Sequence, residues 1–90
     1  MLADCKVSDW IIFKVPKSNE HHIGVVLEEP KVDSIWYKLQ FHVTVNETTN
    51  IYTKAEEHLQ GYWNSDNRFV LPYKPTIEEV FKIKQTQEKE

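Results

Sequence analysis

Four histidines are the side chains of this sequence best suited to bind a metal ion: His21, His22, His42 and His58. A zinc site needs three or four ligands brought together, usually with cysteine or acidic partners. His21 and His22 are adjacent, and neighbouring side chains of a strand point to opposite faces, so these two do not share an ion. Cys5, the one cysteine, supplies no Cys-rich zinc site and no intramolecular disulfide. We therefore expect solvated histidines, no metal site and no cofactor.

Patterns typical of catalysis are equally sparse. Cys5 has no helix start or evident base beside it that would activate the thiol. The sequence contains no nucleophile elbow, no Gly-rich phosphate loop and no nucleotide fingerprint. Glutamate pairs at 28–29, 56–57 and 78–79 are interpreted as solvated loops and a helix start, or alternatively as an acidic surface for a basic partner. We expect a protein without enzymatic activity.

The segment 34–46, SIWYKLQFHVTVN, has the most regular pattern in the chain. Apolar side chains occupy alternate positions from Ile35 to Val45, and mostly polar side chains stand between them. This period of two predicts a strand with a buried face that includes Tyr37 and a solvated face that includes Trp36. Because typical strands have only about five or six residues, we expect this long strand to bend and to serve two parts of a sheet.

An exposed tryptophan on a polar face is typical of a binding surface, since Trp is enriched at interface hot spots. We predict that a protein partner contacts the outward side of this strand, with Trp63 as a possible neighbour. The predicted contact residues are Trp36, Lys38, Gln40, His42 and Trp63.

Three other arrangements of the aromatic residues stay open. The C-terminal helix or a loop could cover Trp36, because apolar residues of that helix need a buried surface: Ile77, Val80 and Phe81. The pair Tyr62-Trp63 could pack around a loop as a small cluster of its own. If Trp10, Trp36 and Trp63 converged, they could enclose a cation such as a methylated lysine.

The elements that must position these side chains are mainly strands. Five segments are rich in β-branched and aromatic residues, which predicts strands at 7–15, 22–28, 35–45, 51–55 and 68–73. Gly24, inside the second segment, indicates a bulge or a close backbone approach. Asn50 suits the left-handed position of a hairpin turn, and Gly61 would close a single helical turn at 55–59.

The C-terminal segment is predicted to be a helix over residues 76–86. Thr76 and Glu79 fit a capping box, in which each side chain bonds the backbone of the other residue. Residues 87–90 form a polar tail that we expect to fray.

The composition predicts one globular domain over residues 1–90. Aromatic residues make up 12% of the chain, which suits a small core. The net charge is −3 and Arg68 is the only arginine, whereas general nucleic-acid binders neutralise phosphates with many Lys and Arg side chains. No apolar run is long enough to cross a bilayer, and the N-terminus has no secretory signal pattern. We expect a soluble cytoplasmic protein that does not bind membranes and for which nucleic acid is a disfavoured partner.

The order of the predicted elements resembles the Src-homology-3-like small barrels, a group that includes KOW and Tudor modules. Two segments carry the resemblance: residues 8–13, SDWIIF, are similar to the start of a first barrel strand, and residues 22–26, HIGVV, to a second strand. The resemblance implies a mainly β, five-stranded small barrel over residues 7–73, followed by the C-terminal α-helix. The Ala-Leu-Tyr signature of peptide-binding Src-homology-3 domains is absent, so polyproline binding is not implied.

These observations together predict a non-enzymatic interaction module that binds a protein partner through its aromatic and polar face. A role as regulator or inhibitor fits, because the size and the residue usage are similar to those of small accessory proteins of tailed bacteriophages that bind host proteins. The alternatives are a nucleic-acid-associated module in the manner of KOW and Tudor domains, and a structural subunit that uses the same face to form a homo-oligomer.

Overall fold

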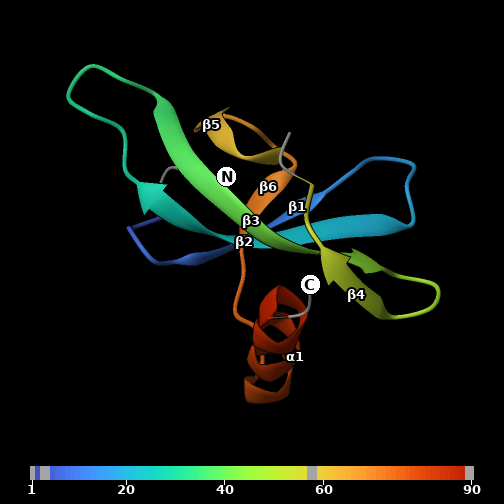
Figure 1. The fold of residues 1–90 in the computed structure, drawn as a ribbon. Helices are drawn as coiled ribbons and strands as arrows, with labels where there is room; N and C mark the ends of the chain where they lie inside the picture. The colour runs from blue at the N-terminus through green and yellow to red at the C-terminus, as the bar shows by residue number, and fades with distance from the viewer. Residues whose placement is uncertain (1, 3–4, 57–58, 89–90) are drawn as a thin grey trace.

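The computed structural model describes residue 2, residues 5–56 and residues 59–88. It shows one antiparallel sheet and a C-terminal helix (Figure 1). The elements are β1 (Trp10–Lys14), β2 (Glu20–Glu28), β3 (Trp36–Asn46), β4 (Ile51–Lys54), β5 (Gly61–Asn64), β6 (Val70–Pro72) and α1 (Ile77–Glu88). The predicted mainly β class is confirmed. Nowhere in the described ranges is a helix long and apolar enough to cross a membrane.

The sheet has six strands where the sequence predicted five. Their order is β4-β3-β2-β1-β6, and β5 pairs with β3 off this path. The additional strand is β5, which begins at Gly61, a residue that we expected to end a helical turn instead. That turn was predicted at 55–59 and includes residues 57–58, which lie outside the described part of the chain. Within the described residues the sheet is not closed, so the predicted barrel is not confirmed.

The long strand β3 bends and serves two parts of the sheet, as predicted. It pairs with β2 through residues 38–46, with β5 through residues 36–39 and with β4 through residues 43–46. Gln60 fills the interval between β5 and β4. Its side-chain amide accepts a hydrogen bond from the Phe41 N–H (2.9 Å) and donates one to the Phe41 carbonyl (2.7 Å). One side chain thus replaces a neighbouring strand where the bend leaves the backbone unpaired.

A bulge at His42 reverses the faces of β3. Phe41 pairs with Gly24 while Val43 pairs with Ile23, so β3 has one extra residue at this point. A Cβ on Gly24 would lie 2.1 Å from the Gln40 carbonyl oxygen, so the close backbone approach predicted there is present. The prediction that Ile35 to Val45 share one buried face is therefore wrong, because an inserted residue moves the later side chains to the other face.

The two faces carry two separate cores. On the first face, Tyr37, Leu39 and Phe41 pack with apolar residues of neighbouring elements: Leu2, Cys5, Ile11, Val26, Leu59 and Val70. On the second face, Val43 and Val45 pack with Ile12, Ile23 and Ile83. The pairing of Ile11 with Gly24 and of Ile12 with Ile23 shows that these are opposite sides of the sheet.

Helix α1 packs against β3 and β4 on the second face, at the end of the sheet distant from the β2–β3 loop (Figure 1). Among the described residues, Ile83 is the one side chain of α1 that is fully buried. Ile77 and Phe81 are 91% and 62% exposed, so the expectation that they become buried is wrong. Both side chains stay exposed because the rotation of the helix places them on the side that is turned away from the sheet.

The start of α1 is capped as predicted, but only in part. The Thr76 hydroxyl accepts a hydrogen bond from the Glu79 N–H (3.1 Å). The Glu79 carboxylate accepts hydrogen bonds from the phenols of Tyr52 and Tyr73. Glu79 therefore joins the helix to the sheet. At the β3–β4 turn, Asn50 has the predicted left-handed backbone with φ of 59°.

Candidate binding groove

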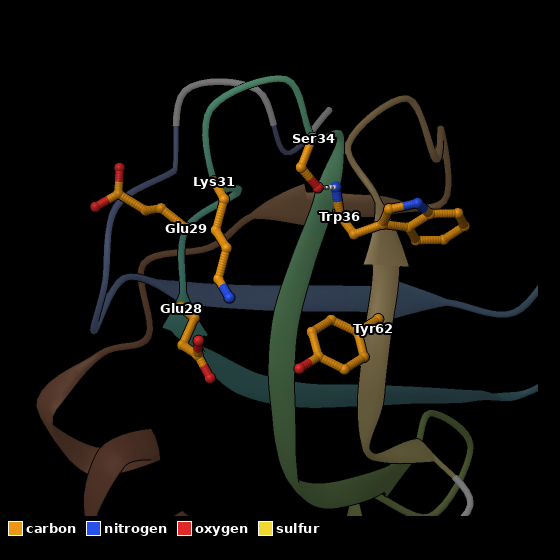
Figure 2. A pocket seen from close by; sticks show the side chains of 6 residues that line it. All are labelled: Glu28, Glu29, Lys31, Ser34, Trp36 and Tyr62. Carbon is orange, nitrogen blue, oxygen red and sulfur yellow. Dashed lines mark hydrogen bonds between the residues drawn. The ribbon is translucent and has the colours of Figure 1, made fainter.

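An open groove of about 470 Å³ lies where β2 ends and β3 begins (Figure 2). The residues that line it come from the end of β2, the β2–β3 loop, β3 and β5: Glu28, Glu29, Lys31, Ser34, Trp36 and Tyr62. Figure 2 shows the charged side chains of Glu28, Glu29 and Lys31 on one side of β3, and the two rings on the other side. The groove therefore has an aromatic part and a charged part.

The pairing of β3 with β5 brings the two aromatic rings to the same face. Tyr37 pairs with Trp63, and both side chains belong to the first core. Side chains alternate along each strand, so Trp36 and Tyr62 point outward. Trp36 is 50% exposed and Tyr62 is 65% exposed. Helix α1 does not cover Trp36, which excludes one of the alternatives left open by the sequence.

The loop before β3 fixes the backbone that carries Trp36. Asp33 has a left-handed φ of 66°, and the Ser34 N–H donates to the Lys31 carbonyl (2.9 Å), which closes a tight turn. The Ser34 hydroxyl then accepts a hydrogen bond from the Trp36 N–H (3.2 Å). On the other side of Trp36, the Ser65 N–H donates to the Ile35 carbonyl (2.8 Å). These bonds hold the aromatic part of the groove in place before any partner arrives.

The charges around the groove are nearly balanced. Lys38 Nζ lies 3.4 Å from Glu28 Oε2, and Lys6 Nζ lies 3.7 Å from Glu29 Oε1. All four side chains are well exposed, and such pairs contribute little stability because water screens them. Basic groups of a partner can therefore replace these lysines beside the two carboxylates.

The structure places the five predicted contact residues in three settings. Trp36 lines the groove and Lys38 lies beside it, paired with Glu28. Gln40 and His42 line a different depression near the end of α1, where the Gln87 amide donates to His42 Nδ1 (2.6 Å). Trp63 faces the first core, against the rings of Phe13 (4.9 Å between centroids) and Phe41 (5.4 Å).

Tyr62 is the groove residue that the sequence did not identify. In Tyr62-Trp63, alternation requires that one ring turn outward, but the residues themselves do not indicate which. The pairing of β5 with β3 determines which ring turns outward: Trp63 is opposite the buried Tyr37, so Trp63 faces the core and Tyr62 faces solvent.

The three tryptophans do not form a cage. Trp10 packs edge-on to His42 beside the second core, with 6.0 Å between the ring centroids. Trp63 packs in the first core, and Trp36 lines the groove.

Each histidine of the described part has a different neighbour. His21 Nδ1 lies 3.1 Å from a Glu47 carboxylate oxygen, and His22 Nδ1 lies 2.8 Å from the Thr44 hydroxyl. His58 lies outside the described residues. In residues 2, 5–56 and 59–88, no group of three or more His, Cys, Asp or Glu side chains is arranged to hold a metal ion.

Comparisons with protein-family models, with curated proteins and with solved structures found no match to this chain. The groove itself is therefore the feature from which a function can be argued.

Proposed function

We propose that this protein is a non-enzymatic interaction module that binds a segment of a protein partner in the groove, as a regulator or inhibitor of that partner. One observation supports the proposal above the others: Trp36 and Tyr62 project from neighbouring strands and are both at least half exposed beside an open groove. Large aromatic side chains at hot spots supply much of the binding free energy of protein interfaces.

The charged part of the groove indicates the chemistry of the segment. An apolar or aromatic side chain of the partner would pack on the rings of Trp36 and Tyr62. A basic side chain next to it would reach Glu28 or Glu29, replacing Lys38 or Lys6. A cation placed against an indole gains further stabilisation from the ring face.

The same charges disfavour nucleic acid as the ligand. Single strands bind where stacking aromatics lie in a positively charged groove. Here Glu28 and Glu29 line the groove together with Lys31, and the whole chain carries a net charge of −3. A groove in which carboxylates balance the lysines lacks the excess of positive charge that phosphate binding draws on.

Selection of peptides from a random displayed library tests the proposal. We expect the selected peptides to combine an apolar residue with a neighbouring Lys or Arg, and to bind Trp36→Ala and Tyr62→Ala at least about tenfold more weakly than the unmodified protein. Ile51→Ala is the matched control, because Ile51 is a large exposed apolar residue (58%) on β4, outside the groove.

Two results would contradict the proposal. One is a set of peptides whose affinity is unchanged by both groove substitutions. The other is salt-sensitive binding of single-stranded oligonucleotides that Trp36→Ala abolishes, which would assign the groove to nucleic acid instead.

A further inference from the structure

Helix α1 is attached to the sheet by three side chains in one row. Glu79, Ile83 and Gln87 follow one another at intervals of four residues, so successive members differ by only about 40° around the helix. Glu79 accepts hydrogen bonds from two phenols, and Ile83 is fully buried. The side-chain amide of Gln87 donates to His42 Nδ1 on β3 (2.6 Å). The attachment of the last turn, residues 84–88, therefore depends on a histidine.

His42 accepts this hydrogen bond only in its neutral form. Nδ1 has a free lone pair when the ring proton is on Nε2, whereas both nitrogens carry protons when the imidazole is charged. The ring is half-buried and lies edge-on to Trp10, with 6.0 Å between the ring centroids. Burial lowers the pKa of His42, because the charged ring loses its water. The docked last turn therefore favours the neutral ring.

The charged groups around His42 do not compensate for this loss of water. Among the described residues, Lys54 of β4 is the one other ionisable side chain that lines the same depression, and its charge would repel a protonated ring. The neighbours on β1 and β2 are uncharged: Trp10 and residues 23–27. Along α1, the nearest charges are Lys84 and Glu88, but no described carboxylate forms an ion pair with His42. A protonated His42 therefore has no anionic partner in the described part of the docked structure.

We propose that mild acid releases the last turn of α1 from the sheet: the turn stays docked on β3 while His42 is neutral and detaches when His42 is protonated. Gln87 can turn its amide oxygen toward the charged ring, but the ring then still lacks half of its water. Release returns that water and breaks few contacts, because every described residue of α1 beyond Ile83 is at least partly exposed. Glu79 and Ile83 keep the first two turns in place.

The size of the effect has an upper bound. An exposed imidazole titrates near pH 6.5, so at about pH 5 protonation favours the released turn over the docked turn by at most about thirtyfold. The sign follows from the lowered pKa: docking is fully favoured above about pH 6.5 and is weakened as the pH falls below it. Release also uncovers the depression on β3 that contains Gln40 and His42.

Nuclear magnetic resonance between about pH 7.5 and about pH 5 measures this release, in a range where most carboxylates stay ionised. We expect the Cα chemical shifts of residues 84–88 to move from helical toward random-coil values as the pH falls, with the same midpoint as the His42 ring. The shifts of residues 77–82 should stay helical. His42→Gln should remove the response, because glutamine does not titrate. His21→Gln is the matched control, because His21 contacts Glu47 instead of α1 and should leave the response unchanged.

Gln87→Glu should reverse the response. A carboxylate at this position attracts the protonated ring, so the last turn should be more helical at about pH 5.5 than at about pH 7.5, and the titration midpoint of His42 should rise. Gln85→Glu adds the same charge to the same turn but lines a different depression, and it should behave like the unmodified protein. Constant shifts of residues 84–88 over the whole range would overturn the proposal. So would a response that persists in His42→Gln, or one that both glutamate variants change equally.

Discussion

Replacement of Glu79 by glutamine tests how α1 is attached to the sheet. The Glu79 carboxylate accepts one hydrogen bond from Tyr52 of β4 and one from Tyr73, which precedes the helix. Glutamine keeps the shape and the helix propensity but removes the charge. Its amide group also offers only one oxygen to two phenol donors, so one phenol must turn to accept from the amide nitrogen.

The size of the effect follows from the difference between charged and neutral hydrogen bonds. A bond to a charged group contributes about 1.5–3 kcal/mol, and a neutral one about 0.5–1.5 kcal/mol. If the three groups were fully buried, weakening both bonds would lower the free energy of unfolding by about 2–3 kcal/mol. Because Tyr52, Tyr73 and Glu79 are only half-buried, we expect a loss of about 2 kcal/mol. For a chain of this size, the thermal midpoint should fall by about 8–16 °C.

Urea and thermal unfolding of Glu79→Gln measure this loss, and Glu78→Gln is the matched control. Both changes remove a negative charge from the first turn of α1, but the exposed Glu78 holds neither phenol. Tyr73→Phe and the double variant complete a cycle that isolates the bond itself. Equal loss of stability in the two glutamine variants would refute the reasoning.

The pH dependence provides a second measurement on the same cluster. Burial and the hydrogen bond to Glu79 raise the pKa of Tyr73 to about 12, and the same causes raise the pKa of Tyr52. The folded state holds these protons more tightly than the unfolded state, whose phenols titrate near pH 10. The stability that these protonated phenols contribute to the fold is therefore fully present below about pH 10 and is lost as the pH rises toward 12. The unmodified protein should lose stability over this range more steeply than Glu79→Gln.

Further substitutions test the attachment of the helix, the bulge at Gly24 and the burial of His42. Ile83→Ala should lower the free energy of unfolding by about 2–5 kcal/mol, measured in urea, because this side chain is fully buried. Ile77→Ala on the same helix should lower it by less than about 0.5 kcal/mol, because Ile77 is exposed. Gly24→Ala should cost about 3 kcal/mol or prevent folding, since its methyl group meets backbone that cannot move aside; an unchanged urea midpoint would contradict the bulge geometry. Burial lowers the pKa of His42, so stability should be full above about pH 6.5 and fall as the pH drops below it; His42→Gln should flatten that part of the profile.

The sequence predicts the strands of this fold better than it predicts their faces. Alternation from Ile35 to Val45 correctly indicates one long strand, and its length correctly indicates a bend. The reversal at His42 depends on the partner strand, where Gly24 lets the backbone of residues 40–41 approach closely. A pattern along one strand does not contain that information, because the face of each side chain after a bulge is set by pairing.

The groove shows the same division between local and non-local information. The exposure of Trp36 follows from its place in the alternation of β3. The choice of Tyr62 over Trp63 as the second outward ring follows from the register of β5 on β3. That register brings together residues more than twenty positions apart in the sequence, so no local signal marks it.

Helix α1 shows why counting apolar residues overstated what would be buried. Its apolar side chains fall on two sides, with Ile83 toward the sheet and Ile77 and Phe81 toward solvent. Apolar residues spaced three or four positions apart are found on both sides of this helix, so the spacing alone does not indicate which side is buried. It also ignores a carboxylate that attaches the helix through hydrogen bonds. Here Glu79 supplies attachment through Tyr52 and Tyr73, as an apolar residue would through burial. Because a polar cluster shares the attachment, one fully buried side chain is sufficient to hold the helix, and the apolar residues on the other side remain exposed.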